Sequence, residues 1–249
     1  MKLLLTLCLA LCSLLSFSQA KENFYVLDSN WKQTVVDSAK YLFWIHQNED
    51  GNWVHSYYHM WGPMIKMETY KDHDGSQRNG LSCYYYANGK LDSIGHYKDG
   101  KKEGIFIRYR FSNNDSSLQV ARTYQYLNDS LLSITDAGPG AENNKDGIGD
   151  KAAEYPGGLP QWQQFLMKNL HYPDRAAGNK VQGEVQVSFT VDEEGNVIEP
   201  LISKSVEYSL DRESLRMIGL SGKWIPGLMS GKTAKTNKIQ PFRFRLSNQ

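Results

Sequence analysis

The sequence has almost no excess charge, because its 28 Lys and Arg residues are matched by 27 Asp and Glu residues, for a formal net charge of +1 over 249 residues. Proteins that bind nucleic acid or anionic membrane surfaces in bulk depend on a basic excess. That excess is missing here. The composition therefore argues against nucleic acid as a partner.

Cysteine is also scarce. Two of the three cysteines, Cys8 and Cys12, lie in an apolar segment at the N-terminus, and only Cys83 remains in the rest of the chain. A single thiol cannot form an intramolecular disulfide, so the mature fold depends on its hydrophobic core. Cys83 lies in the strand-like run LSCYYY, which indicates a buried thiol rather than a nucleophile.

The N-terminal apolar run, Leu3–Leu15, is shorter than the roughly 20 residues that span a bilayer. Lys2 precedes the run, and the small-residue segment Ser18–Ala20 follows it. This order predicts a cleavable secretory signal peptide over residues 1–20, and hence a protein that is exported from the cytoplasm. An uncleaved anchor in the inner membrane is the alternative.

Recognisable catalytic motifs are missing as well. His55 and His59 could ligate zinc if they lay on a helix, but their surroundings are typical of a strand, in which four residues span about 13 Å. The sequence contains no phosphate-binding Gly loop ahead of a helix, no nucleophile elbow and no paired carboxylates in an apolar context. It therefore predicts a protein that is not an enzyme and that holds no metal or cofactor.

Tyrosine and glycine, by contrast, are regularly spaced in the front half. Tyr58 and Tyr85 are each followed four residues later by a glycine, Gly62 or Gly89, and further tyrosines follow these glycines. The spacing predicts a unit of strand, Gly turn, strand and Gly turn, in which glycine supplies the positive φ of the turns. Because one hairpin cannot bury its aromatic face alone, neighbouring units must stack.

This half of the chain resembles MORN-type repeat proteins over about residues 54–109. The resemblance implies a short β-meander that serves as a scaffold or interaction surface, within a β-rich region over residues 21–134. Residues 135–153 are rich in Gly, Asn and Asp and predict a linker. A second domain is therefore expected over residues 154–249.

Two amphipathic patterns in this second domain predict helices. The segment GLPQWQQFLMKNL places Trp162, Phe165 and Leu170 near one face. The segment SLDRESLRMIGLSG predicts a second helix that Ser209 caps and that ends at Gly222.

Two alternating patterns predict strands. Apolar and polar residues alternate through Val185–Val191, so one face of this strand is buried. The last strand, about residues 236–246, alternates in the same way between apolar and basic side chains. Its inward side chains are Phe242 and Phe244, and its outward ones are Arg243 and Arg245.

Several motifs of this domain, in order and spacing, resemble the C-terminal domain of TonB, the periplasmic energy transducer, in its Bacteroidetes-like form. They run from YPGG through YPDRA, QGEVQVSFTVDEEGNV, SLDRESLR and KWIPG to a closing PFRFRL. The resemblance covers about residues 154–246 and implies an α+β fold, with a small antiparallel sheet packed on two helices. The motif positions are Tyr155, Pro156, Gly157, Gly158, Tyr172, Pro173, Gly183, Gly195, Trp224, Pro226 and Gly227.

In that family, W-x-P-G ends the second helix and begins the final strand, which pairs with the TonB-box peptide of outer-membrane receptors by β-strand addition. The resemblance therefore implies that the last strand is an exposed edge. Its basic residues would deter self-pairing and favour an acidic partner. The expected partner-binding residues are Arg175, Lys235, Thr236, Asn237, Lys238, Gln240, Arg243 and Arg245.

TonB itself has an inner-membrane helix and a long Pro-rich spacer, and the sequence predicts neither. The apolar segment is predicted to be cleaved, and the eight prolines form no Pro-rich run. The sequence therefore predicts a periplasmic TonB-like protein, associated with TonB-dependent transport across the outer membrane, that binds receptor peptides or other envelope proteins. Contact with the inner-membrane proton-motive-force complex would be indirect. The alternatives are an envelope adaptor that reuses the fold without transport and, more distantly, an enzyme.

The signal-peptide prediction can be tested directly. We expect cleavage after Ala20, so that mass spectrometry of the native protein finds a mature chain that begins at Lys21. A native chain that retains residues 1–20 and fractionates with the inner membrane would contradict the prediction and favour the anchored alternative.

Overall fold

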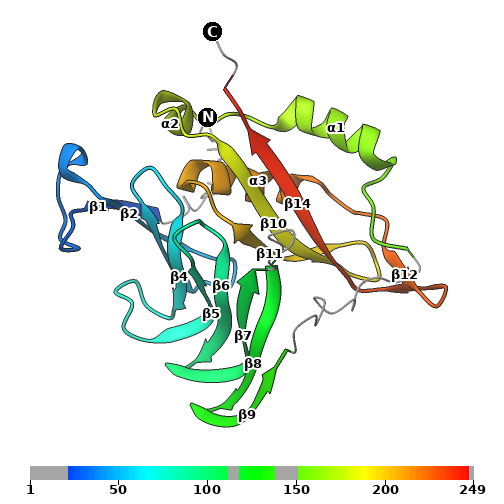
Figure 1. The fold of residues 1–249 in the computed structure, drawn as a ribbon, viewed down its shortest axis with the longest axis horizontal. Helices are drawn as coiled ribbons and strands as arrows, with labels where there is room; N and C mark the ends of the chain where they lie inside the picture. The colour runs from blue at the N-terminus through cyan, green and yellow to red at the C-terminus, as the bar shows by residue number, and fades with distance from the viewer. Residues whose placement is uncertain (1–21, 112–117, 138–150, 247–249) are drawn as a thin grey trace, which may run out of the picture.

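The computed structural model describes residues 22–111, 118–137 and 151–246. They form a long front sheet and a smaller back domain that packs against one part of it (Figure 1). The predicted signal peptide and residues 138–150 of the predicted linker lie outside the described residues.

The front sheet is an antiparallel meander in which each strand pairs with the next along the chain. This arrangement confirms the predicted all-β front half, and a short 3-10 turn, η1 (Val36–Ser38), joins its first two strands. The strands are β1 (Glu22–Leu27), β2 (Tyr41–Gln47), β3 (Trp53–His59), β4 (Met64–Tyr70), β5 (Arg78–Tyr85), β6 (Leu91–Lys98), β7 (Lys101–Phe111), β8 (Leu118–Leu127) and β9 (Ser130–Asp136).

The back domain combines helices with a small sheet, as the predicted α+β fold class requires. Its main sheet is antiparallel, with the strand order β11-β10-β14, and a short β12–β13 hairpin lies beside it. The elements are α1 (Gly158–Asn169), α2 (Asp174–Gly178), β10 (Gly183–Val191), β11 (Val197–Lys204), α3 (Tyr208–Leu220), β12 (Gly227–Met229), β13 (Lys232–Ala234) and β14 (Thr236–Phe244).

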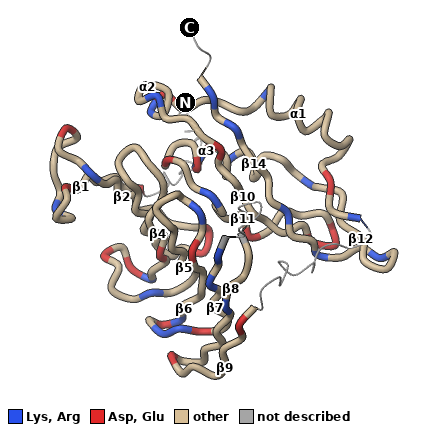
Figure 2. The backbone as a smooth tube through the Cα atoms, viewed as in Figure 1, with Lys and Arg blue, Asp and Glu red and all other residues tan. Residues whose placement is uncertain are grey.

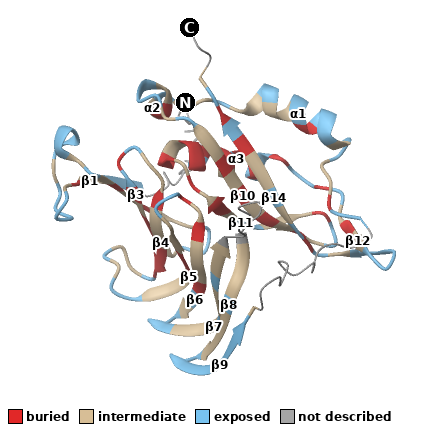
Figure 3. Ribbon diagram, viewed as in Figure 1, coloured by how far each residue is buried: buried red, intermediate tan, exposed pale blue. Residues whose placement is uncertain are grey.

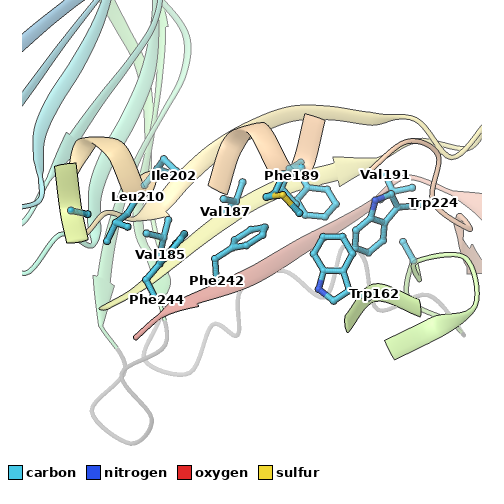
Figure 4. Packing of buried hydrophobic residues seen from close by; sticks show 14 residues of the cluster. Trp162, Val185, Val187, Phe189, Val191, Ile202, Leu210, Trp224, Phe242 and Phe244 are labelled. Atoms are coloured by element: carbon cyan, nitrogen blue, oxygen red, sulfur yellow. The ribbon is translucent and has the colours of Figure 1, made fainter. Parts of the chain in front are cut away.

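The back domain has the larger apolar core. The alternating residues of β10 and β14 point to one face of the sheet, where Trp162 of α1, Leu210 of α3 and Trp224 pack against them (Figure 4). Figure 3 shows buried residues along β10 and β14, whereas every residue of β9, at the far edge of the front sheet, is exposed. Period-two alternation thus fixes which face of the back sheet meets the helices.

Trp224 lies at the centre of an aromatic cluster. Its ring centroid is 5.5 Å from those of Tyr155 and Trp162 and 5.1 Å from that of Phe189, and its Nε1–H donates to Ser221 Oγ at 2.9 Å. The backbone N–H of Trp224 also donates to Gly195 O at 2.9 Å. The helix end is therefore joined to both the core and the β10–β11 turn.

The connection after Trp224 differs from the one that the sequence analysis expected. The chain does not pass directly into the last strand but first forms the β12–β13 hairpin. Ser230 and Gly231, at the tip, both have positive φ, of 51° and 75°, as a two-residue type I′ hairpin turn requires. The dipeptide Ser-Gly was the signal for this turn.

The N-terminus of α3 also differs from the prediction. The capping residue is Glu207, whose carboxylate accepts hydrogen bonds from the backbone N–H and the hydroxyl of Ser209 at 2.8 and 2.5 Å. Ser209 lies in the first turn of the helix, two residues after Glu207. It donates hydrogen bonds to the capping residue and is not itself the cap. Glu207 is fully buried, so this cap lies inside the protein and not at its surface.

A polar contact centred on Ser205 joins the two parts of the molecule. Ser205 donates its backbone N–H to Gly89 O at 2.8 Å, and its Oγ accepts from the N–H of Met64 at 2.7 Å. Gly89 has a φ of +80°, and a Cβ there would lie 2.1 Å from Ser205 O, so only glycine allows this approach. The β5–β6 turn of the front sheet is therefore held against the end of β11.

Asp211 completes this contact from α3. Its carboxylate is fully buried and lies 2.5 Å from Ser205 Oγ, and it accepts from Val206 N–H at 3.0 Å. Burial raises the pKa of Asp211 to about 8, and the two hydrogen bonds oppose this shift only in part. The carboxyl is therefore protonated over much of the neutral range in the folded state.

The position of Trp224 predicts a large loss of stability on truncation. We expect Trp224→Ala to lower the free energy of unfolding by about 3–5 kcal/mol, because it leaves a cavity among three packed rings. Ile225→Ala is the matched control, since Ile225 is 41% exposed and its truncation should cost less than about 1 kcal/mol. Similar denaturant midpoints for the two variants would contradict the assignment of Trp224 to the core.

Asp211 predicts a specific pH dependence of stability. The carboxyl titrates near pH 4 when unfolded and at about pH 8 when folded, so the folded state binds more protons between these values and stability falls as pH rises. Burial lowers the pKa of His46 to about 4, which acts in the opposite sense, but only below its unfolded value of 6.5.

The window from pH 6.5 to 8 therefore isolates Asp211 from His46. Across it we expect the free energy of unfolding to fall by about 1.5 kcal/mol in the wild-type protein and to stay level in Asp211→Asn. Urea melts at both pH values measure the difference. An equal slope in the two proteins would show that Asp211 is ionised when folded.

Candidate functional site: the open edge of β14

The back sheet ends at β14, which pairs on one side only within the described residues. Its register with β10 is continuous from Gly183 opposite Phe244 to Val191 opposite Thr236. At the other side of the sheet, β11 has a β-bridge from Lys204 to Lys90 of the front sheet, and Tyr85 donates its hydroxyl to Ile202 O at 2.9 Å. The front sheet therefore occupies part of the β11 edge, and β14 is the more accessible edge.

Pro241 shows which backbone groups of β14 face the open side. Proline has no backbone N–H, so within a sheet it occupies positions at which an N–H would point away from the neighbouring strand. Antiparallel pairs alternate between those that exchange hydrogen bonds and those that do not. The N–H and C=O groups of Gln240 and Phe242 therefore point to β10, and those of Ile239 and Arg243 point to the open edge.

The side chains of β14 divide by the same alternation. Thr236, Lys238 and Gln240 share the face of the buried Phe242, whereas Asn237, Ile239 and Arg243 share the opposite face and are exposed. Thr236 is only 1% exposed, and Ile239 is 51% exposed. Three of the expected partner-binding residues, Thr236, Lys238 and Gln240, thus lie on the side of the sheet that meets the helices.

Lys238 is held by contacts within the domain. Its Nζ donates to Ala153 O at 3.0 Å and lies 5.5 Å from the centroid of the Trp224 ring. Burial lowers the pKa of this ammonium group, as expected for a cation partly removed from water. Lys238 therefore fixes the segment before α1 to the sheet and has little freedom to reach a partner.

The exposed face of β14 is basic but partly neutralised. Figure 2 marks Lys and Arg positions along the strand. Arg243 donates its Nε–H to the Glu184 carboxylate of β10 at 2.8 Å, and Asn237 accepts from the Thr190 hydroxyl at 2.8 Å. Lys235 and Arg245 are exposed at the two ends of the strand and supply its remaining positive charge.

Arg175, the remaining expected partner-binding residue, makes its contacts elsewhere. Its Nε–H donates to Glu207 Oε1 at 2.6 Å, and its Nη2 donates to Met60 O at 2.5 Å. The guanidinium also lies 4.1 Å from the centroid of the Trp61 ring. Arg175 is thus engaged between α3 and the β3–β4 turn of the front sheet, not at the open edge of β14.

The motif residues lie in turns and in the core around this edge. Tyr155 packs on Trp162 and Trp224, and the Tyr172 hydroxyl donates to Val181 O at 2.6 Å. Gly157 and Gly158 both have positive φ at the start of α1. A Cβ on Gly195 would lie 2.2 Å from Trp224 O, so glycine is needed there. These contacts hold the sheet and give the motif a structural role.

Other kinds of site find little support. In the part of the chain that the structure describes, no group of three His, Cys, Asp or Glu side chains could hold a metal ion. No helix within those residues has the length and apolar content to cross a bilayer. Cys83 is fully buried, and burial raises the pKa of its thiol, which opposes formation of the reactive thiolate.

Comparison with known proteins identifies one region. Residues 168–246 match the family described as Gram-negative bacterial TonB protein C-terminal. The match begins at the end of α1 and runs through β14, so it covers the whole back sheet and less than half of the chain. Neither the curated proteins nor the solved structures compared with the chain contain a match.

Proposed function

We propose that this protein is a TonB-like binding protein of the cell envelope, and that its back domain binds an extended peptide by strand addition along β14. The premise is the match of residues 168–246 to the TonB C-terminal family, whose members act at the envelope as transducers and binding modules rather than enzymes. The expected partner is the TonB-box segment of an outer-membrane receptor, met in the periplasm.

The open edge of β14 is the observation that carries this proposal. Its outward backbone groups, at Asn237, Ile239 and Arg243, have no strand beside them within the described residues. An incoming strand would satisfy these groups, and main-chain hydrogen bonds supply most of the affinity in this mode of recognition. The buried Phe242 and Phe244 keep the strand in place without occupying its outer edge.

The positive charges near β14 are expected to contribute more to the choice of partner than to the binding affinity. Lys235 and Arg245 remain exposed near the ends of β14, and Arg243 forms an ion pair with Glu184. These cations favour an acidic segment and disfavour pairing with a second copy of the same basic edge. Their contribution is expected to weaken as salt rises, since all of them are solvent-exposed.

The proposal also assigns a role to the front sheet. In this proposal the MORN-like meander is an additional interaction surface, and the secretory signal delivers both parts to the periplasm. An adaptor that reuses the back domain without taking part in transport is the alternative. Titration with TonB-box peptides separates the two, because the adaptor has no reason to bind them.

The backbone alternation of β14 supplies a sharp test with a matched control. Ile239→Pro removes one outward N–H and places a ring at the open edge, so we expect TonB-box peptides to bind about tenfold more weakly. Ile239→Ala keeps the N–H and should retain most of the affinity. Fluorescence anisotropy with labelled peptides measures both, after thermal melts establish that both variants are folded.

Gln240→Pro serves as a contrast, because the Gln240 N–H points to β10. We expect this variant to have a lower free energy of unfolding, so any loss of peptide binding would accompany a loss of stability. A folded Ile239→Pro variant with wild-type affinity would contradict strand addition at β14. Failure of every TonB-box peptide to bind the wild-type protein would favour the adaptor.

A further inference from the structure

A recess lies between the front sheet and the back domain, formed by residues outside β14. Its volume is about 360 Å³, within the range of small-molecule sites, and sites of this kind occur preferentially between domains. Four parts of the front half, namely β1, η1, β2 and the β3–β4 turn, and two helices of the back domain, α2 and α3, contribute to it. The lining residues are Phe24, Val26, Val36, Leu42, Met60, Trp61, Arg175 and Tyr208.

The walls and the mouth of this recess are apolar. The Phe24 ring packs edge-on against Tyr208 at 5.2 Å, and both rings belong to the lining. Phe24, Val36 and Trp61 are 44%, 58% and 41% exposed, although each is a large apolar side chain. These side chains line the same recess, so they leave apolar surface that a bound apolar chain could cover.

Arg175 is the one charged residue of the lining. Glu207 and the Met60 carbonyl use two of its five N–H donors, and Trp61 lies against the guanidinium plane. The remaining donors have no partner among the described residues. Glu207 also accepts two hydrogen bonds from Ser209, so its carboxylate is satisfied and the guanidinium is held in one orientation.

We propose that this recess binds a single-chain amphiphile of the fatty-acid class, with the apolar chain among the aromatic and aliphatic walls and the carboxylate on the free donors of Arg175. A carboxylate matches the planar guanidinium in shape and charge. Because Glu207 already balances the charge of Arg175, this hydrogen bonding selects the head group, and the apolar walls supply most of the affinity.

A peptide fits the recess less well. Each residue of a peptide carries a backbone N–H that needs an acceptor when it is buried. The Met60 carbonyl already accepts from Arg175, and the Tyr208 hydroxyl already accepts from Arg212 at 2.7 Å. A fatty acid has one polar group, at its end, and therefore leaves no buried donor unsatisfied.

The test is calorimetric titration of the purified full chain with decanoate, below the concentration at which decanoate forms micelles. We expect saturable binding of one molecule, and binding about tenfold weaker for decanol, which lacks the charged head. Arg175→Gln should remove the preference for decanoate over decanol. This variant also breaks the contact with Glu207, so its melt must be measured.

Two neighbouring valines supply a matched pair that does not depend on Arg175. Val36 lines the recess, whereas Val35 is 68% exposed and does not line it. We expect Val36→Glu to weaken decanoate binding at least about tenfold, through charge repulsion and loss of apolar contact, and Val35→Glu to leave it unchanged.

Three outcomes would overturn the inference. The first is the absence of saturable binding of decanoate to the wild-type protein. The second is an equal response of the Val36→Glu and Val35→Glu variants. The third is binding of a capped apolar dipeptide that Val36→Glu abolishes, without any binding of decanoate, which would assign the recess to a peptide side chain. None of these outcomes depends on strand addition at β14.

Discussion

The contact between Ser205 and the β5–β6 turn is the constraint on which the rest of the arrangement depends. A three-stranded sheet has two edges, and unpaired edges invite association. Here the Gly89 carbonyl and the Met64 N–H bind Ser205 just beyond β11. This contact places the front sheet against one edge of the back sheet and leaves the other edge, β14, for a partner.

Beyond this contact, the same few residues serve both parts of the molecule. Glu207 caps α3 and also orients Arg175, which in turn binds the β3–β4 turn of the front sheet. Asp211 belongs to α3 and reaches Ser205. Because these buried polar groups satisfy one another, the front sheet and the back domain share one interface rather than two independent surfaces.

The sequence predicted the fold class and the core of the back domain because alternation is a local property. The apolar positions of Val185–Val191 are buried as expected, and regular Tyr and Gly spacing correctly predicted the meander. The same alternation also predicts which side chains of the last strand share one face of the sheet. Phe242 was expected to face inward, so Thr236, Lys238 and Gln240, which differ from it by even numbers, share its face.

Other features depended on partners that are distant in sequence. The local preference for serine at an N-cap favours Ser209, but in the structure the cap of α3 is Glu207. The direction of Arg175 is set by Met60 and Trp61, more than a hundred residues earlier. The recess beside it is likewise formed only when both parts of the chain come together. Pairwise contacts of this kind cannot be found from composition or periodicity.

Amide hydrogen exchange along β14, followed by NMR with and without a bound TonB-box peptide, tests the central claim most directly. In the free protein, the amides of Gln240 and Phe242, which point to β10, should exchange slowly, and those of Ile239 and Arg243 should exchange fast. Peptide binding should slow the second pair and leave the first pair unchanged. Fast exchange at Ile239 and Arg243 in the saturated complex, or protection confined to the front sheet, would contradict strand addition at this edge.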